Sequence, residues 1–196
     1  MSNYTKSQAP LEQLAGQLDD VVSGDTALSG PPVDQWDPPD RGQLAMRITR
    51  DGQWHYEGKP LTRPALVKLF ASILRRDSGD DYCLVTPVEK FHIQVDDVPF
   101  VAHTLEVQSP GPDQVLWLTT SSQDRLALGP DHPLSVQQDT QTGEPAPYVR
   151  VRRNLYARLE RSAYYHLVEL AQEREQGGER HLGVTSYGEF FSLGAL

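Results

Sequence analysis

The stretch over residues 46–97 constrains the fold of this chain most, because its predicted elements follow one another without a gap. Leu44, Met46 and Ile48 alternate with polar residues, which predicts a half-buried strand over residues 43–50. The dipeptide Asp51-Gly52 favours a tight hairpin turn, so a return strand is expected directly after it. This part of the chain is therefore predicted to begin with a β-hairpin.

A helix and a buried strand complete the stretch. Thr62 can cap a helix by accepting a backbone hydrogen bond, and Pro64 suits the first helical turn, so a helix is predicted to about Arg75. Its apolar stripe consists of Leu66, Val67, Leu69, Phe70, Ile73 and Leu74. The apolar run at residues 82–86 predicts a strand buried on both faces, and residues 91–95 alternate as the next strand.

The second half of this stretch is similar in sequence to a segment near the C-terminus. Residues 61–63 (LTR) resemble residues 159–161 (LER), at an offset of 159 − 61 = 98. We interpret this similarity as a duplicated helix-strand unit, and the alternative is a chance similarity of two periodic segments. The duplication predicts equivalent core positions for four residues, Leu69 with Leu167 and Phe70 with Val168.

The expected fold class is α+β, with two small structurally similar domains built from repeated helix-strand units. A second helix is predicted over residues 154–173, and an antiparallel β meander is predicted between the two helices. The strand candidates of this meander are residues 100–107, 114–119, 126–128 and 134–138. The predicted domains are residues 34–97 and 98–196, each α+β, preceded by a polar tail over residues 1–33.

The polar tail contains one apolar stripe with helical spacing, over residues 11–22. Three interpretations remain open: a short helix packed on its own domain, a helix that docks on a partner, and disorder. The composition of the tail offers few groups to bury, so deletion of residues 1–30 is expected to leave the melting temperature almost unchanged.

Charge and hydropathy exclude several classes of protein. The formal net charge is −9 and the pI is about 5.1, which argues against binding to a nucleic-acid backbone. No apolar run approaches the ~18 residues of a membrane span, and the first residues lack the apolar region of a secretory signal. A cytoplasmic protein that binds neither nucleic acid nor membranes is expected. The oligomeric state is not indicated by the sequence.

Metal ligands and catalytic groups give weak signals. Cys83 lies in the apolar run YCLV and is expected to be a buried, inert thiol. His92 and His103 would face each other, near Asp96 or Asp97, if residues 91–107 formed a hairpin, but exposed strand histidines are the plainer interpretation. No metal site and no cofactor are predicted. No nucleophile elbow or phosphate-binding glycine loop occurs, so no catalytic residue is predicted either.

Arginine residues offer a sharper candidate site. Guanidinium groups bind carboxylates and phosphates through paired hydrogen bonds, so Arg47, Arg63 and Arg152 are predicted to hold a small anionic ligand at the junction of the two units. The alternative is that these side chains pair with acidic residues of the chain, namely Glu57, Glu89 or Glu189.

Several motifs resemble a known family. They are WDPPDRGQLAMRITRDGQWHYEGKPLTRPALVKLFASILRR, GDDYCLVTPVEK, PYVRVRRNLYARLERSAYYHLVE and GEFFSLG. Together they make residues 30–196 similar to the bacterial domain-of-unknown-function family twelve-eighty-five. The resemblance implies a two-domain α+β fold with repeated structural motifs and a role in signal transduction. It implies no catalytic residue.

The function expected from these observations is a non-enzymatic regulatory or ligand-sensing protein. Its partner would be a small anionic ligand or another protein. Two alternatives stay open: an enzyme of unrecognised type with a site at the domain junction, and an oligomerising scaffold.

Overall fold

The computed structural model of this protein describes residue 16 and residues 30–139 and 142–196. The helix predicted over residues 11–22 therefore lies outside the described residues, apart from Gly16. Two compact units form within the chain, as a two-domain organisation requires. The first comprises residues 1–47 and 54–94, and the second comprises residues 48–53 and 95–196. Each unit is described by itself.

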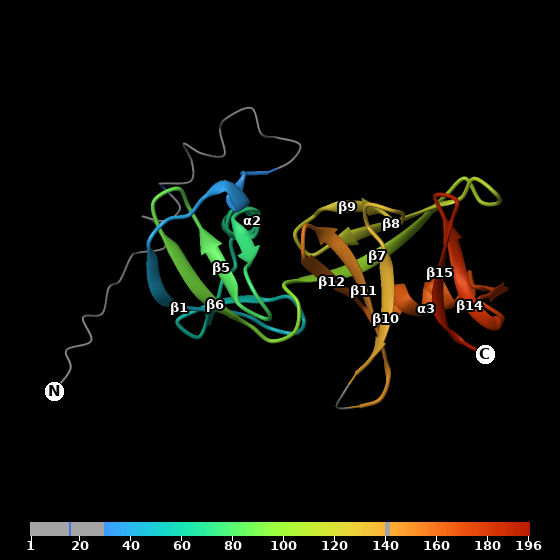
Figure 1. The fold of residues 1–196 in the computed structure, drawn as a ribbon. Helices are drawn as coiled ribbons and strands as arrows, with labels where there is room; N and C mark the ends of the chain where they lie inside the picture. Colours follow the sequence, from blue (N-terminus) through green and yellow to red (C-terminus); the bar gives the residue numbers. More distant parts are fainter. Residues whose placement is uncertain (1–15, 17–29, 140–141) are drawn as a thin grey trace. The chain divides into compact units, whose positions relative to one another are not determined.

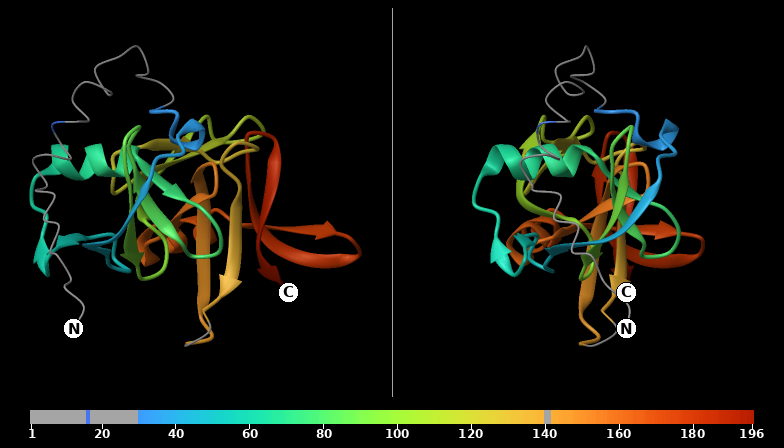
Figure 2. Two further views of the ribbon diagram at one scale, coloured as in Figure 1. Left: turned by 60° about the vertical axis from the view of Figure 1, so that its left-hand side comes forward. Right: turned by 90° about the vertical axis from the view of Figure 1, so that its left-hand side faces the viewer.

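The predicted α+β fold class is wrong, because strands make up most of the regular structure and the sheets are curled (Figures 1 and 2). The described residues contain two α-helices, each of nine residues, α2 (Pro64–Ser72) and α3 (Arg161–Glu169). The helix predicted to Arg75 ends at Ser72, and the next residues form strand β4. The helix predicted over residues 154–173 is helical only in α3, because residues 155–159 form strand β12, in which Leu155, Ala157 and Leu159 are buried with the period of two of a strand.

The first unit is built on one six-stranded sheet with the strand order β3-β2-β1-β6-β5-β4. A short 3₁₀ helix, η1 (Val33–Gln35), precedes it. The strands are β1 (Asp40–Ile48), β2 (Trp54–Tyr56), β3 (Lys59–Pro60), β4 (Leu74–Arg76), β5 (Tyr82–Val85) and β6 (Lys90–Val95). The hairpin expected from Asp51-Gly52 is present, with β1 beside β2 and Gly52 at a φ of 78°.

The core of the first unit lies between this sheet and α2. All four residues of β5 are buried, as the apolar run predicted. Phe70 of α2 is fully buried and its ring stacks on that of Trp54, with 6.5 Å between the ring centroids. The remaining core side chains of this unit include Met46, Ile73 and Leu74. Burial of this apolar surface is the main stabilising contribution to the unit.

The second unit contains two sheets (Figure 1). The larger has the order β10-β11-β12-β7-β8-β9, and the smaller has the order β13-β14-β15. The strands are β7 (Phe100–Gln108), β8 (Val115–Thr120), β9 (Arg125–Ala127), β10 (Leu134–Gln138), β11 (Pro145–Arg152), β12 (Leu155–Leu159), β13 (Gln172–Gln176), β14 (Glu179–Ser186) and β15 (Glu189–Ala195).

The larger sheet is not the single antiparallel meander that the sequence predicted. It consists of two antiparallel meanders, β7-β8-β9 and β10-β11-β12, joined by a parallel pair of strands. In that pair Ala157 lies opposite Phe100 and Leu159 lies opposite Ala102. The prediction missed the join because β12 was assigned to a helix.

The predicted equivalence of core positions in the two helices is also wrong. Val168, which was paired with the buried Phe70, is 37% exposed on α3. Leu167 is the fully buried residue of α3, while Leu69 is half-buried on α2. The surroundings differ as well, because β4-β5-β6 continues into a six-stranded sheet whereas β13-β14-β15 stands as a sheet of three. Shared apolar periodicity produced the apparent match.

Neither helix of the described residues is long and apolar enough to cross a membrane.

Candidate functional site

A row of polar side chains crosses the sheet of the first unit. Cys83 on β5 lies directly opposite Arg75 on β4 and opposite His92 on β6. Directly opposed residues of antiparallel strands project from the same face of a sheet, so the three side chains are neighbours. The loop between β4 and β5 adds Asp77 and Asp81 beside this row.

His92 is held between two carboxylates. Its Nδ1 lies 2.6 Å from Asp81 Oδ1, and its Nε2 lies 2.7 Å from Asp40 Oδ2. These contacts raise the pKa of His92, with the hydrogen bond to Asp40 the largest cause and that to Asp81 the next. The hydrogen bond from His92 lowers the pKa of Asp40 in return, together with a hydrogen bond from the backbone N–H of Gly42. The imidazolium form of His92 therefore suits both partners.

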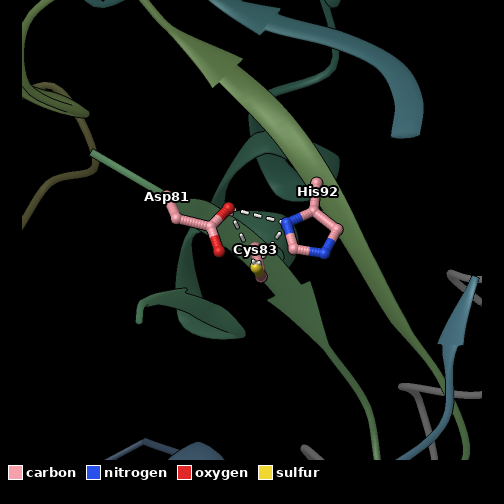
Figure 3. A group of neighbouring side chains, drawn as sticks. All are labelled: Asp81, Cys83 and His92. Atoms are coloured by element: carbon pink, nitrogen blue, oxygen red, sulfur yellow. Dashed lines mark hydrogen bonds and ion pairs between the residues drawn. The ribbon is translucent and has the colours of Figure 1, made fainter. Parts of the chain in front are cut away.

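Cys83 lies beneath this histidine and is fully buried (Figure 3). Its Sγ is 3.4 Å from His92 Nδ1, 3.9 Å from Asp81 Oδ1 and 4.0 Å from Asp77 Oδ2. Burial raises the pKa of the Cys83 thiol to about 12, and the negative charges of Asp81 and Asp77 add to the effect. Without a bound cation, Cys83 is therefore a neutral thiol at pH 7.

Arg75, oriented by Asp77, connects the row to the N-terminal segment of the unit. Arg75 Nε donates to Asp77 Oδ1 at 2.5 Å, and Lys90 Nζ lies 3.2 Å from Asp77 Oδ2. The hydrogen bond from Arg75 is the main cause of the lowered pKa of Asp77. Arg75 Nη1 also donates to the backbone carbonyls of Val33 and Trp36, at 2.9 Å and 2.8 Å. The guanidinium thus joins η1 to the sheet.

We call these groups the Cys83–His92 cluster. Its members are Asp40, Arg75, Asp77, Asp81, Cys83, Lys90 and His92. Three carboxylates face two permanent cations and one histidine, so the cluster is neutral when His92 is protonated and has one negative charge when it is not. Asp81, Cys83 and His92 each direct one metal-ligating atom to a common point, with all three atoms within 4.8 Å of one another.

The structure bears on two sequence interpretations, one for Cys83 and one for His92 with His103. The prediction of a buried thiol at Cys83 is confirmed. His92 and His103 do not face each other across a hairpin, because β6 pairs with β5 and β1 whereas β7 pairs with β12 and β8. His103 Nδ1 instead lies 2.9 Å from Thr104 Oγ1.

The pairing of Cys83 with His92 was missed although the sequence contains a signal for it. The turn between β5 and β6 fixes the register, since Thr86 N–H donates to the Glu89 carbonyl and Val85 pairs with Lys90. Counting outward from this turn places Cys83 opposite His92. Asp40 has no local signal, because it lies 52 positions from His92 in the sequence.

The three arginines predicted to bind an anion lie in different units. Arg47 is exposed on β1, and Arg63 is exposed at the N-cap of α2, both in the first unit. Arg152 belongs to the second unit, where its Nη1 lies 3.7 Å from Asp124 Oδ2 and its guanidinium lies over the Phe100 ring. Burial lowers the pKa of Arg152. Asp124 is thus an acidic neighbour of Arg152.

The second unit has its own charged cluster, formed by Arg50, Asp97, Asp139, Tyr148 and Arg158. Arg158 donates to Asp97 at 3.0 Å and to Asp139 at 3.4 Å, and Arg50 donates to Asp139. Tyr148 donates its hydroxyl proton to Asp97 at 3.0 Å. Two guanidinium groups meet two carboxylates here, so the charges balance within the protein. This cluster has the composition of a structural ion-pair network.

Comparisons with known proteins agree on one family. The model of the DUF1285 N-terminal domain, a domain of unknown function, matches residues 31–98, and the model of the C-terminal domain matches residues 99–193. The crystal structure of a DUF1285 family protein from Silicibacter pomeroyi DSS-3 is 44% identical, with a TM-score of 0.81 over 95% of this chain and 96% of that chain. That of a DUF1285 family protein from Shewanella baltica OS155 is 30% identical, with a TM-score of 0.50 over 64% of this chain and 91% of that one. None of the curated proteins matches the chain.

Proposed function

This chain belongs to the DUF1285 family, and from that premise we propose that it is a non-enzymatic regulatory protein that senses a small ligand. The ligand site is the Cys83–His92 cluster. One observation carries the proposal: Asp81, Cys83 and His92 converge on one point, yet the thiol among them is fully buried. Such a set of donors suits reversible binding better than attack on a substrate.

The state of Cys83 argues against covalent catalysis. A catalytic cysteine reacts as its thiolate, in surroundings that lower its pKa and leave the sulfur accessible. Here burial and two carboxylates raise the pKa of Cys83 to about 12, and the sulfur has no exposed surface. His92 Nδ1 also lies nearer to Asp81, at 2.6 Å, than to Cys83 Sγ, at 3.4 Å.

Occupancy of the cluster has a physical route to the surface of the unit. A ligand held by Asp81 and Cys83 would lie next to Asp77, whose Oδ2 is 4.0 Å from Cys83 Sγ. Asp77 orients Arg75, which in turn holds the carbonyls of Val33 and Trp36. We infer that ligand binding changes the stability of η1 by altering this pairing. A protein partner would recognise the η1 segment in one of its two states.

A thermal-shift screen of the full chain tests the proposal. A ligand selective for the folded state raises stability by RT ln(1 + [L]/Kd), or about 2.7 kcal/mol at a hundredfold excess over Kd. The screen includes metal ions and anionic metabolites, so that a ligand of Arg47, Arg63 or Arg152 is also detected. We expect the response to be lost in His92→Gln and retained in the control His103→Gln. A response that survives His92→Gln would place the ligand elsewhere.

Hydrogen exchange tests the sensing step. Amide exchange over residues 33–37 is expected to change when the ligand found in the screen is added, and the change is expected to disappear in Asp77→Asn. Exchange in β10 and β11 of the second unit provides the internal reference. Ligand binding with unaltered exchange over residues 33–37 would contradict a signal through η1.

A thiol-dependent enzyme is the second candidate, because the cluster contains the series Cys83, His92 and Asp40. The distances, 3.4 Å from Sγ to Nδ1 and 2.7 Å from Nε2 to Asp40, fit a nucleophile, a base and an orienting carboxylate. Iodoacetamide labelling at pH 7 decides between the candidates. The sensing protein predicts labelling of Cys83 only after unfolding in urea, whereas an enzyme predicts labelling of the native protein at a rate above that of free cysteine.

We further propose that the protein acts in the cytoplasm as a component of a signal transduction pathway. The net charge of −9 supports a protein that stays away from nucleic acids and anionic membrane surfaces. Fractionation of cells that express the chain at its native level tests the location. Recovery with the membrane fraction would contradict it.

A further inference from the structure

The geometry of the Cys83–His92 cluster points to one ligand class, and we propose that Asp81, Cys83 and His92 bind a divalent metal ion of the zinc type. The inference rests on the proposed function, since it names the ligand of the same site. The three donors come from two adjacent strands and the loop before them, and Figure 3 shows Asp81 and His92 turned toward each other over Cys83.

The donor distances fit a tetrahedral ion. With Zn–S near 2.3 Å and Zn–N and Zn–O near 2.0 to 2.2 Å, tetrahedral angles place sulfur about 3.5 Å from the nitrogen and from the oxygen, and place nitrogen about 3.4 Å from oxygen. The distances from Cys83 Sγ are 3.4 Å to His92 Nδ1 and 3.9 Å to Asp81 Oδ1. The Nδ1–Oδ1 distance is 2.6 Å and must open by about 0.8 Å. Asp81 can supply this movement, because its side chain is 40% exposed.

Asp40 provides the outer contact that metal-bound histidines usually have. A histidine that ligates through one ring nitrogen donates its other N–H to a carboxylate or carbonyl, which fixes the tautomer and the ring orientation. Asp40 Oδ2 accepts from His92 Nε2 at 2.7 Å and so leaves Nδ1 as the ligating atom. The same nitrogen is the one that faces Cys83. This contact does not involve the three donor atoms, and it also identifies Nδ1 as the ligating atom of His92.

The proton and charge balance of the cluster also fits a divalent ion. Binding forms bonds from the ion to the thiolate, the imidazole and the Asp81 carboxylate, and it releases the thiol proton of Cys83 and the Nδ1 proton of His92 to solvent. Loss of two protons and gain of one divalent cation leaves the net charge of the cluster unchanged. Asp77, 4.0 Å from the sulfur, lies close enough to add to the attraction for a cation.

The ligand types select the metal. Thiolate and imidazole favour zinc and its neighbours in the transition series, whereas magnesium and calcium require sites made of oxygen ligands. Three protein ligands leave a fourth position for a water molecule or a small ligand. The exposed parts of Asp81 and His92, 40% and 24% of their side chains, give this position access to solvent. Occupancy by zinc is the state that the sensing protein would report.

The first test measures zinc binding by the full chain after removal of metals with a chelator. Competition against a zinc indicator is expected to give one zinc per chain, with binding weakened strongly in Cys83→Ser and His92→Gln. Asp40→Asn, which neutralises the outer carboxylate and leaves the three ligands in place, is expected to weaken binding about 10- to 100-fold and less than the ligand variants. The controls are His103→Gln and Asp80→Asn, and both should bind zinc as the unmodified chain does. The Asp80 side chain is 87% exposed. Circular dichroism checks that each variant is folded.

The second test does not depend on any variant. Addition of cobalt(II) to the unmodified, metal-free chain is expected to give the intense visible bands of tetrahedral cobalt and a near-ultraviolet band from thiolate to metal charge transfer. Zinc is expected to displace the cobalt and remove both bands. A cobalt complex without the thiolate band, or zinc affinity equal in the chain and in folded His92→Gln, would overturn the metal site.

The outcomes separate this inference from the proposed function. Absence of zinc binding, together with another compound that shifts the melting temperature through His92, would overturn the metal and keep the sensing site. Zinc binding without any change of exchange over residues 33–37 would keep the metal and overturn the signal through η1.

Discussion

Gly183 of β14 lies so close to the ring of Phe190 of β15 that a β-carbon at Gly183 would be 2.5 Å from Phe190 Cζ. The carbonyl oxygen of Phe191 lies equally near on the backbone side. The register of β14 with β15 shifts between Leu182 and Gly183, so the irregularity of the strand coincides with this contact. A glycine is therefore required for the two strands to approach at this point.

Gly183→Ala is expected to destabilise the protein by about 1 to 3 kcal/mol, because the added methyl group must displace the aromatic ring and the backbone of β15. Gly194→Ala on β15 is the matched control, since a β-carbon there meets no atom within 4 Å. Urea unfolding followed by circular dichroism measures both. Equal stability of the two variants would show that β15 can shift without cost.

Phe70→Ala is expected to cost about 3 to 5 kcal/mol, because it empties a fully buried site next to Trp54. Lys68→Ala on the same helix is the control, since Lys68 is exposed and alanine suits a helix. The melting temperature and the urea midpoint report the difference. A loss below about 1 kcal/mol for Phe70→Ala would mean that the first unit contributes little to the measured transition.

Asp139→Asn is expected to destabilise the second unit by about 2 to 3 kcal/mol. The Asp139 side chain is only 5% exposed and accepts hydrogen bonds from Arg50 and Arg158, so its neutralisation leaves two cations with one fewer partner. The expected loss is smaller than that for a fully buried ion pair, because the Arg50 side chain is 45% exposed. Glu106→Gln, which breaks the exposed pair with Arg125, should change stability by less than about 1 kcal/mol. A double-mutant cycle of Asp139→Asn with Arg50→Gln gives the coupling directly.

Stability of the metal-free protein should fall in alkali through Cys83. The pKa of this thiol is raised from 9.0 to about 12 on folding, so above pH 9 the unfolded chain loses a proton that the folded chain keeps. The unfolded state then binds fewer protons, and the free energy of unfolding decreases as pH rises. Between pH 8 and pH 10 the unmodified chain is expected to lose about 1.4 kcal/mol more than Cys83→Ser. Parallel pH profiles of the two proteins would contradict the buried neutral thiol.

The sequence predicted those parts of the fold that local patterns determine. The β1–β2 hairpin follows from Asp51-Gly52, the start of α2 from Pro64, and the burial of β5 from its apolar run. The helix expected across residues 154–173 failed because a short strand and a short helix together imitated one long apolar stripe. Tertiary context decides between helix and strand here, because residues 155–159 form a strand by pairing with β7 and β11.

The candidate site depends on pairings that a single sequence hides. Burial of Cys83 could be predicted from its neighbours, but its use depends on His92 across the hairpin and on Asp40 from another strand. The sequence hypothesis of an anion site at Arg47, Arg63 and Arg152 arose from residue type, without knowledge of the units to which they belong. Residue type alone could not assign these side chains to a site.

The parallel pairing of β12 with β7 has a consequence for the folding of the chain on the ribosome. Ala157 pairs with Phe100 across 157 − 100 = 57 residues, whereas each of the two meanders closes through short turns. Local pairings form fast and distant ones form late, because a long loop must be ordered first. Until residue 159 has left the exit tunnel, β7 has an unpaired edge that can recruit a strand from another nascent chain. Slow translation through residues 108–159 would prolong that exposure, so the yield of folded protein should depend on the speed of synthesis in this segment.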